Sequence, residues 1–255
     1  MNAFRFDTID STNEAAKRMI DARQIHEPCY LTAREQTAGK GSHGRIWLSP
    51  RDAGLYLSVV DLPPDPDVKV TSAYTLAAGI ACVEAIGEAT GLDVMLKPIN
   101  DLYVGRAKLG GILVEAVIQS GRVTALITGI GINVFYADRP LGKDAVRPIC
   151  LQQLMPAPHV AQLDLAALEE LLAERVLSWN VRVHQGHADD VRRVWQRHAT
   201  GPDACADSPV SSRSASAEPH RPGGPPEPTP CRTAEPPSST AAGSAGSAST
   251  TAGRR

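Results

Sequence analysis

The composition of the chain changes abruptly near Gly201, and this change limits the length of chain that can fold. From 201 to 255, Ala, Gly, Pro, Ser and Thr make up 41 of 55 residues, and the stretch holds half of the 20 prolines. It contains one Val and no Leu, Ile, Met, Phe, Tyr or Trp. Such a stretch lacks the apolar surface that would offset the entropy lost on ordering. We therefore predict a disordered Pro/Ser/Ala-rich tail over 201–255. The folded domain is predicted over 1–200, which is enough for one substantial core.

Charge and cysteine content exclude several classes of protein. A formal net charge of −2 provides no general basic surface for nucleic acid, so we expect no DNA partner. No apolar run approaches the ~20 residues that cross a bilayer, and the N-terminal residues lack the apolar core of a signal peptide. The five cysteines are scattered without Cys-x-x-Cys spacing, and the seven histidines form no ligand cluster. These features predict reduced thiols in a cytoplasmic protein, with no membrane segment and no protein-held metal.

Hydrophobic periodicity predicts strands in the first part of the chain and helices at its end. Strands are predicted at 4–9, 29–35, 55–61, 94–97, 102–104, 108–119 and 123–134. Helices are predicted at 11–23, 72–89, 164–185 and 189–198. Ser11 and Glu14 fit a capping box, Ser72 is the expected cap of the second helix, and Gly91 is its expected end. The proline-containing segment 136–158 is expected to be irregular. This order of elements indicates an α+β layer fold.

The stretch 35–47 is rich in glycine and carries two fixed cations. It reads Glu-Gln-Thr-Ala-Gly-Lys-Gly-Ser-His-Gly-Arg-Ile-Trp, with Lys40 and Arg45 between and after the glycines. Glycine lets the main chain approach a ligand closely, and exposed amides in such a loop form an anion-binding nest. A solvent-exposed hairpin loop has a similar composition, so the stretch alone leaves both interpretations open. It is not a Walker A loop, because the spacing of its glycines and its strand-to-helix context differ from that motif.

A second stretch, 96–115, favours the ligand-binding interpretation. It reads Leu-Lys-Pro-Ile-Asn-Asp-Leu-Tyr-Val-Gly-Arg-Ala-Lys-Leu-Gly-Gly-Ile-Leu-Val-Glu. Together the two stretches resemble the biotin protein ligases. That family carries Gly-Arg-Gly-Arg-x-Gly-Arg-x-Trp, Lys-Trp-Pro-Asn-Asp and Lys-Leu-x-Gly-Ile-Leu-x-Glu, which correspond in order to 39–47, 97–101 and 108–115. The sequences Asp-Ser-Thr-Asn at 10–13 and Gly-Ile-Gly-Ile-Asn at 129–133 agree as well.

The resemblance covers roughly residues 5 to 198 and implies a fold. It implies a mixed β-sheet packed on helices, related to the catalytic core of class II aminoacyl-tRNA synthetases. The chain begins almost directly at this domain, so it resembles the single-function ligases that have no N-terminal DNA-binding domain. The family ends in a small SH3-like β-domain, and the tail 201–255 stands where that domain is expected.

The resemblance also implies a two-step reaction. The carboxylate of biotin attacks the α-phosphate of ATP, with Mg²⁺ on the phosphate oxygens, and forms biotinyl-5′-AMP and pyrophosphate. A lysine amine of a biotin carboxyl carrier protein domain then attacks the mixed anhydride and releases AMP. Biotin and ATP with its Mg²⁺ are therefore the expected substrates, and the carrier domain is the expected partner. The oligomeric state stays open, with a homodimer as one alternative.

Site residues follow from the resemblance, position by position. Lys108 is the main catalytic candidate, because its family counterpart touches both the biotin carboxylate and the α-phosphate; Arg45 is the second. The expected biotin contacts are Ser11, Thr12, Asn13, Gln36, Gly39, Lys40, Gly41, Ser42, Lys108 and Gly111. The expected nucleotide contacts are Lys40, Arg45, Trp47, Asn100, Asp101 and Asn133. Glu35 and His43 are interpreted as loop residues without a catalytic role.

Each of these positions also has a purely structural interpretation. Ser11 can cap a helix, the Asn100-Asp101 pair can form a turn, Asn133 can end a strand, and Lys108 can be a solvated lysine at the start of a strand. Ser42 departs from the family, which usually carries an arginine at this position.

Two other functions compete with biotin ligation. The first is a lipoate or octanoate ligase or transferase of the same fold. The Lys-Pro-Ile-Asn-Asp and Lys-Leu-Gly-Gly-Ile-Leu-Val-Glu blocks favour biotin, and no cysteine lies in either motif to serve as an octanoyl transferase nucleophile. The second is a catalytically impaired protein that binds biotin or its adenylate, an alternative supported by the tail in place of the C-terminal domain.

Overall fold

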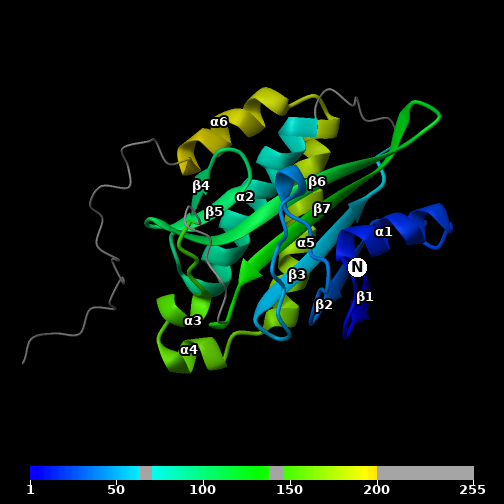
Figure 1. The fold of residues 1–255 in the computed structure, drawn as a ribbon. Helices are drawn as coiled ribbons and strands as arrows, with labels where there is room; N and C mark the ends of the chain where they lie inside the picture. The colour runs from blue at the N-terminus through cyan, green and yellow to red at the C-terminus, as the bar shows by residue number, and fades with distance from the viewer. Residues whose placement is uncertain (64–70, 138–145, 200–255) are drawn as a thin grey trace, which may run out of the picture. The chain divides into compact units, whose positions relative to one another are not determined.

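The structure, a computed structural model, describes residues 1–63, 71–137 and 146–199, and the predicted tail lies outside them. Its centre is a seven-stranded sheet with strand order β1-β2-β3-β7-β6-β5-β4 (Figure 1). The strands are β1 (Asn2–Phe6), β2 (Cys29–Ala33), β3 (Gly54–Asp61), β4 (Met95–Lys97), β5 (Asp101–Val104), β6 (Ala107–Gln119) and β7 (Arg122–Asn133). β1 and β2 pair in parallel, and every other neighbouring pair is antiparallel. The predicted α+β fold with a mixed sheet is confirmed.

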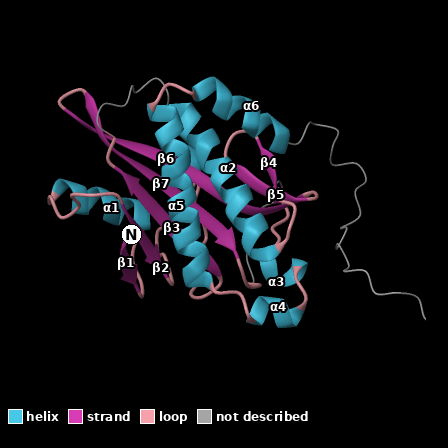
Figure 2. Ribbon diagram, turned by 180° about the vertical axis from the view of Figure 1, so that it is seen from behind, coloured by secondary structure: helices cyan, strands magenta, loops and turns pink. Residues whose placement is uncertain are grey.

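Helices cover both faces of this sheet. They are α1 (Thr12–Asp21), α2 (Thr71–Thr90), α3 (Leu151–Leu154), α4 (Ala157–Ala161), α5 (Leu165–His184) and α6 (Ala188–His198), with a 3₁₀ turn at Ser42–Gly44. Successive side chains of a strand point to opposite faces, and β3 shows the result. Leu57 and Val59 of β3 pack with α2 and α5, whereas Val60 packs with Ala15 and Ala16 of α1. α1 therefore lies on one face, and α2 with α5 on the other (Figures 1 and 2).

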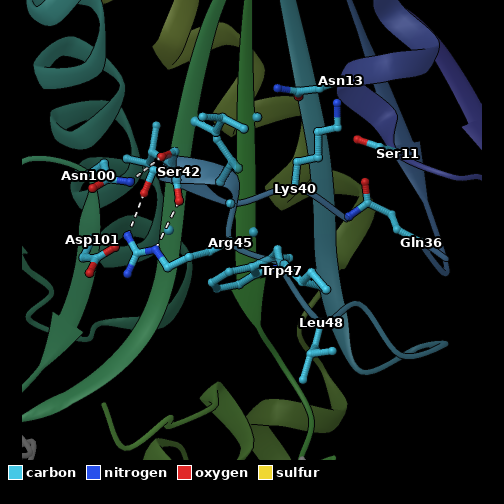
Figure 3. Close-up of a pocket in the computed structure, with 18 of the residues that line it drawn as sticks. Ser11, Asn13, Gln36, Lys40, Ser42, Arg45, Trp47, Leu48, Asn100 and Asp101 are labelled. Atoms are coloured by element: carbon cyan, nitrogen blue, oxygen red, sulfur yellow. Dashed lines mark hydrogen bonds between the residues drawn. The ribbon is translucent and has the colours of Figure 1, made fainter. Parts of the chain in front are cut away.

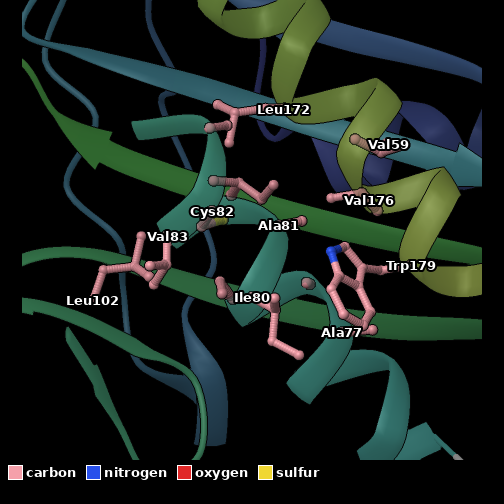
Figure 4. Close-up of a cluster of buried hydrophobic side chains, with 14 of the residues drawn as sticks. Val59, Ala77, Ile80, Ala81, Cys82, Val83, Leu102, Leu172, Val176 and Trp179 are labelled. Carbon is pink, nitrogen blue, oxygen red and sulfur yellow. The ribbon is translucent and has the colours of Figure 1, made fainter. Parts of the chain in front are cut away.

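The larger core lies between the sheet and α2. This helix carries no Asp, Glu, Lys or Arg before Glu84, and the side chains from Ala77 to Cys82 in it include several with no exposed surface. Leu172, Val176 and Trp179 of α5 face α2 across this core (Figure 4). The uncharged sequence of this part of α2 thus agrees with its deep burial. Among the helices of the described residues, none is long and apolar enough to cross a membrane.

The two predicted helix caps are wrong in detail. Ser11 does occupy the N-cap of α1, but its side chain caps no amide. Its own backbone N–H donates to Oδ1 of Asp10 at 2.8 Å, and Glu14 forms ion pairs with Lys17 and Lys40 instead of closing a capping box. α2 already begins at Thr71, so Ser72 lies in its first turn. Gly91 does end α2, with φ +70° and its N–H donated to the carbonyl of Gly87.

The segment predicted to be irregular contains helical structure where it is described. α3 and the start of α4 lie within 146–158. The prediction rested on the prolines, but a proline is tolerated in the first turn of a helix, where its missing N–H would have no helical partner. Pro158 takes that place in α4. Residues 138–145 lie outside the described part of the chain.

Candidate functional site

A cavity of about 420 Å³ opens on the face of the sheet that carries α1. It lies between the N-terminal end of α1, the glycine-rich loop and the middle of β6 and β7 (Figure 3). All predicted site residues except Gly39 and Asn133 line it: Ser11, Thr12, Asn13, Gln36, Lys40, Gly41, Ser42, Arg45, Trp47, Asn100, Asp101, Lys108 and Gly111. Segments up to about a hundred residues apart in sequence thus meet at one place, and neither Glu35 nor His43 is among the lining residues.

Glycines of β6 and β7 make room for two lining side chains. A Cβ on Gly131 would lie 2.4 Å from Cε2 of Trp47, and one on Gly111 would lie 3.3 Å from the same ring. A Cβ on Gly129 would lie 2.6 Å from Oδ1 of Asn13. The indole and the amide therefore rest directly on the strand backbones. Gly129 and Gly131 line the cavity and are absent from the predicted site, although the repeated glycines at 129–133 were a signal for them.

The side of the cavity next to α1 is lined mainly by uncharged polar side chains, with Lys40 beside them (Figure 3). Ser11, Thr12 and Asn13 are buried at the start of α1, where helical N–H groups have no helical acceptor. The backbone N–H of Thr12 donates to Oε1 of Gln36 at 2.8 Å, and Nε2 of Gln36 donates to Oγ of Ser49 at 2.8 Å. Gln36 is thereby held in one orientation. This side can offer hydrogen bonds to a neutral polar group.

The opposite side holds cations (Figure 3). Nζ of Lys108 lies 2.7 Å from Oδ1 of Asp101 and 5.5 Å from the centre of the Trp47 ring. Arg45 is turned back on its own loop, where Nε donates to the carbonyl of Ser42 at 3.1 Å and an Nη donates to Ser42 Oγ at 2.7 Å. Both cations line the cavity, so this side can neutralise an anion.

The third cation, Lys40, connects the glycine-rich loop to α1. Its Nζ lies 2.7 Å from Oε1 of Glu14, which also binds Lys17 at 2.8 Å. Hydrogen bonds from Lys17 and then Lys40 hold the pKa of the Glu14 carboxyl below its usual range. Glu14 is therefore ionised at neutral pH, and it tethers the loop to the helix over the cavity.

Asn100 ends the turn between β4 and β5, Asp101 begins β5, and both line the cavity. The Asn100 side chain donates to the carbonyl of Ile112 at 2.8 Å, and the backbone of Ile112 donates to the carbonyl of Asn100 at 2.8 Å. Asn100 thus holds the entry of β5 against β6, as a turn asparagine would. Both residues nevertheless line the cavity, with Asp101 directed at Lys108.

Two predicted site residues lie outside the cavity lining. A Cβ on Gly39 would lie 2.4 Å from the carbonyl of Trp47, so this glycine permits the loop backbone to pair closely. The buried side chain of Asn133 donates to the carbonyls of Ile149 at 3.0 Å and Lys108 at 3.3 Å. Through its amide nitrogen it joins the chain after 146 to β6. Its assignment to the nucleotide stays a prediction.

Comparison with known proteins identifies the family. The sequence model of the family described as "Biotin/lipoate A/B protein ligase family" matches residues 5–133 of this chain. The chain belongs to this family. The bifunctional ligase/repressor BirA of Bacillus subtilis is 36% identical to this family member over 128 residues, which are 50% of this chain and 39% of BirA. The chain thus matches well under half of the length of that relative. The biotin–[acetyl-CoA-carboxylase] ligase of Paracoccus denitrificans is 28% identical over 215 residues, 83% of this chain and 85% of that protein.

The fold of this family member is also that of solved biotin protein ligases. The biotin protein ligase from Aquifex aeolicus, in complex with biotin and ATP, superposes with a TM-score of 0.63 at 25% sequence identity. The superposition covers 78% of each chain. Among the residues that the structure describes, no group of three His, Cys, Asp or Glu side chains could hold a metal ion.

Proposed function

We propose that this protein activates biotin with ATP as biotinyl-5′-AMP and transfers the biotinyl group to a lysine of a biotin carrier protein domain. The observation that carries the proposal is one cavity with a neutral polar side at Thr12 and Gln36 and a cationic side at Lys108 and Arg45. Support comes from the Aquifex aeolicus relative, which binds biotin and ATP.

The two sides of the cavity match the two ends of biotin. The bicyclic end carries an uncharged cyclic urea with two N–H donors and one carbonyl acceptor, which suits hydroxyl and amide side chains. The other end is a carboxylate, which suits a cation. Trp47 rests on glycines of two neighbouring strands and offers an apolar surface to the part of the ligand that passes it.

Activation brings two anions together, so fixed cations have to act where charge develops. An oxygen of the biotin carboxylate attacks the α-phosphorus of ATP, the bond to the bridging oxygen breaks, and pyrophosphate leaves. We assign to Lys108 the stabilisation of the charge that develops on the phosphate oxygens, with Arg45 turning from Ser42 toward the nucleotide. Mg²⁺ belongs to the ATP substrate in this proposal and is held by phosphate oxygens.

Transfer uses the same cavity. The amine of the carrier lysine attacks the acyl carbon of the adenylate, the acyl–oxygen bond breaks, and AMP leaves with the electron pair. Enclosure of the adenylate matters because water would otherwise hydrolyse the anhydride. The tether from Lys40 to Glu14 holds the glycine-rich loop over the cavity and contributes to this enclosure.

The proposal is tested with the full chain, biotin and ATP labelled at the α-phosphate. Labelled biotinyl-AMP should form without a carrier, and label should appear as free AMP when a biotin carrier domain is added and becomes biotinylated. Lipoate and octanoate replace biotin in parallel reactions. Faster activation of either acid would assign the site to that acid, and binding of biotin without adenylate would indicate a protein that binds but does not catalyse.

A further inference from the structure

Two side chains outside the cavity lining connect the buried polar residues of α1. Oγ of Ser58, on β3, lies 2.5 Å from Oδ1 of Asn13 and 2.7 Å from Oγ1 of Thr12. Oε2 of Glu115, on β6, accepts a hydrogen bond from Nδ2 of Asn13 at 2.7 Å. Ser58 is fully buried. Neither Ser58 nor Glu115 lines the cavity, yet both bind residues that do.

The available protons determine the direction of this chain of hydrogen bonds. A carboxylate only accepts, so the amide nitrogen of Asn13 faces Glu115 and the amide oxygen faces Ser58. That oxygen carries no proton, and Ser58 must donate its only hydroxyl proton to it. Ser58 can then only accept from Thr12, so the Thr12 hydroxyl proton points to Ser58. The direction of each hydrogen bond is thus set by the previous one, and the first is set by the carboxylate of Glu115.

Thr12 therefore presents lone pairs, and not its proton, toward the cavity. Oγ1 of Thr12 also lies 3.1 Å from Oε1 of Gln36, which accepts the backbone N–H of Thr12 at 2.8 Å, but the single hydroxyl proton of Thr12 is already donated to Ser58. A ligand N–H that enters here meets an acceptor. Without an anionic acceptor at Glu115, the Asn13 amide could turn over, and every hydroxyl proton along the chain could reverse.

We propose that Glu115 is a positioning residue that acts through Asn13 and Ser58 to keep the Thr12 hydroxyl as a hydrogen-bond acceptor for a ligand N–H. The identity of that ligand as biotin rests on the function proposed above, and the N–H is then one of the cyclic urea. Lys17 is the second partner of Glu115, at 2.7 Å, and touches neither Thr12 nor Ser58 among the contacts of the described residues. It supplies the matched control.

The test compares Glu115→Gln, Ser58→Ala, the double variant and Lys17→Met in the full chain. Glu115→Gln keeps the size of the side chain, but its amide can accept or donate, so the direction is no longer set. KM for biotin should rise about ten-fold, the effect of one misdirected hydrogen bond, and KM for ATP should stay within about two-fold. Because the residues act in series, the double variant should lose no more than the larger single loss. Lys17→Met should change KM for biotin by less than three-fold, roughly the effect of a partly exposed ion pair.

If Glu115 and Ser58 only stabilised the fold, their variants would lower the melting temperature and the fraction of active enzyme. Melting temperature and the fraction of active enzyme, by titration of adenylate, separate misfolding of Ser58→Ala from loss of positioning. A second measurement needs no ligand: NMR should show one slowly exchanging Ser58 hydroxyl proton with a contact to Asn13 in the wild type, and its loss in Glu115→Gln.

Three results would overturn the proposal. They are an unchanged KM for biotin and unchanged hydroxyl signal in Glu115→Gln, additive losses in the double variant, and an equal rise of KM in Lys17→Met. A wild type with the expected hydroxyl signal that does not bind biotin would instead refute the proposed function and leave the direction of the hydrogen bonds established.

Discussion

The ammonium group of Lys108 lies 2.7 Å from a carboxylate oxygen of Asp101, and the two side chains are 21% and 18% exposed. The cation that we assign to catalysis is thus paired with an anion before any substrate enters. Because both side chains are mostly buried, solvent and salt screen this pair less than a surface pair. An entering carboxylate or phosphate therefore competes with Asp101 for the ammonium group of Lys108.

Lys108→Ala should lower the rate of adenylate formation by about 10²–10³, because it removes a positioned charge from the place where negative charge develops. Melting temperature should change little, since Lys108 lines the cavity and is not part of the apolar core. Lys97→Ala is the matched control: this lysine is exposed, lies over the Tyr103 ring and does not line the cavity. A normal rate in Lys108→Ala, or an equal loss in Lys97→Ala, would refute the assignment.

Glu14→Gln should loosen the glycine-rich loop. The ion pair with Lys40 is lost while the helix keeps its shape, so trypsin should cleave after Lys40 or Arg45 faster, by about two- to five-fold for an exposed pair. Timed digestion followed by mass spectrometry measures this. Lys17→Met removes the other partner of Glu14 without touching the loop and should leave the cleavage rate unchanged. Equal acceleration in both variants would mean that Glu14 acts on α1 and not on the loop.

Ser42→Arg should slow release of the adenylate. Serine offers one hydroxyl, which already accepts from Arg45, whereas an arginine adds several directed hydrogen bonds and a charge. A contact of this kind corresponds to roughly a ten-fold slower dissociation, which can be followed by chasing labelled adenylate with unlabelled biotin and ATP. Ser42→Ala removes the contact between the Ser42 hydroxyl and Arg45 without adding charge and should not slow release. An off-rate for Ser42→Arg equal to that of the wild type would contradict the prediction.

Asp61→Asn should raise stability at alkaline pH. Asp61 is buried behind the sheet, where it accepts from Nδ2 of Asn180 at 2.9 Å and lies 3.3 Å from Nε2 of His184. Burial raises the pKa of its carboxyl, against the opposing effects of His184 and Asn180. A folded pKa above the unfolded value means that the folded state binds the proton more tightly. The stability that Asp61 contributes is therefore present at low pH and is lost as pH rises through the folded pKa.

Asparagine keeps the shape of this side chain and removes its titration. The variant should be more stable than the wild type at pH 8, and the gain should shrink as pH falls toward 4. Thermal unfolding across this pH range measures the difference. Asp93→Asn, at an exposed position, should leave the profile unchanged. A gain that grows as pH falls would show that the sign of the pKa shift is wrong.

Most elements and most of the site could be predicted from the sequence, because their signals are local. The apolar runs that predicted strands at 55–61, 108–119 and 123–134 correspond to β3, β6 and β7 within one or two residues at either end. Ser120 and Gly121, between β6 and β7, both have positive φ, which suits a tight hairpin turn. Nearly all of the site residues that the motifs predicted line the cavity, because a motif can be read from neighbouring residues without knowledge of the fold.

Only the tertiary structure decided the contacts between segments that are far apart in the chain. Asn13 binds Glu115 across 102 positions of sequence, and Ser58 binds Thr12 across 46, so no local pattern could indicate either pair. The same holds for Asn133, whose amide donates to the carbonyls of Lys108 and Ile149. It also holds for Glu14, which binds Lys40 instead of capping its own helix. A polar side chain satisfies its hydrogen bonds with whichever partners the fold brings near. The sequence thus determined which residues are available for the chemistry, and the packing of strand against helix determined which atoms they bind.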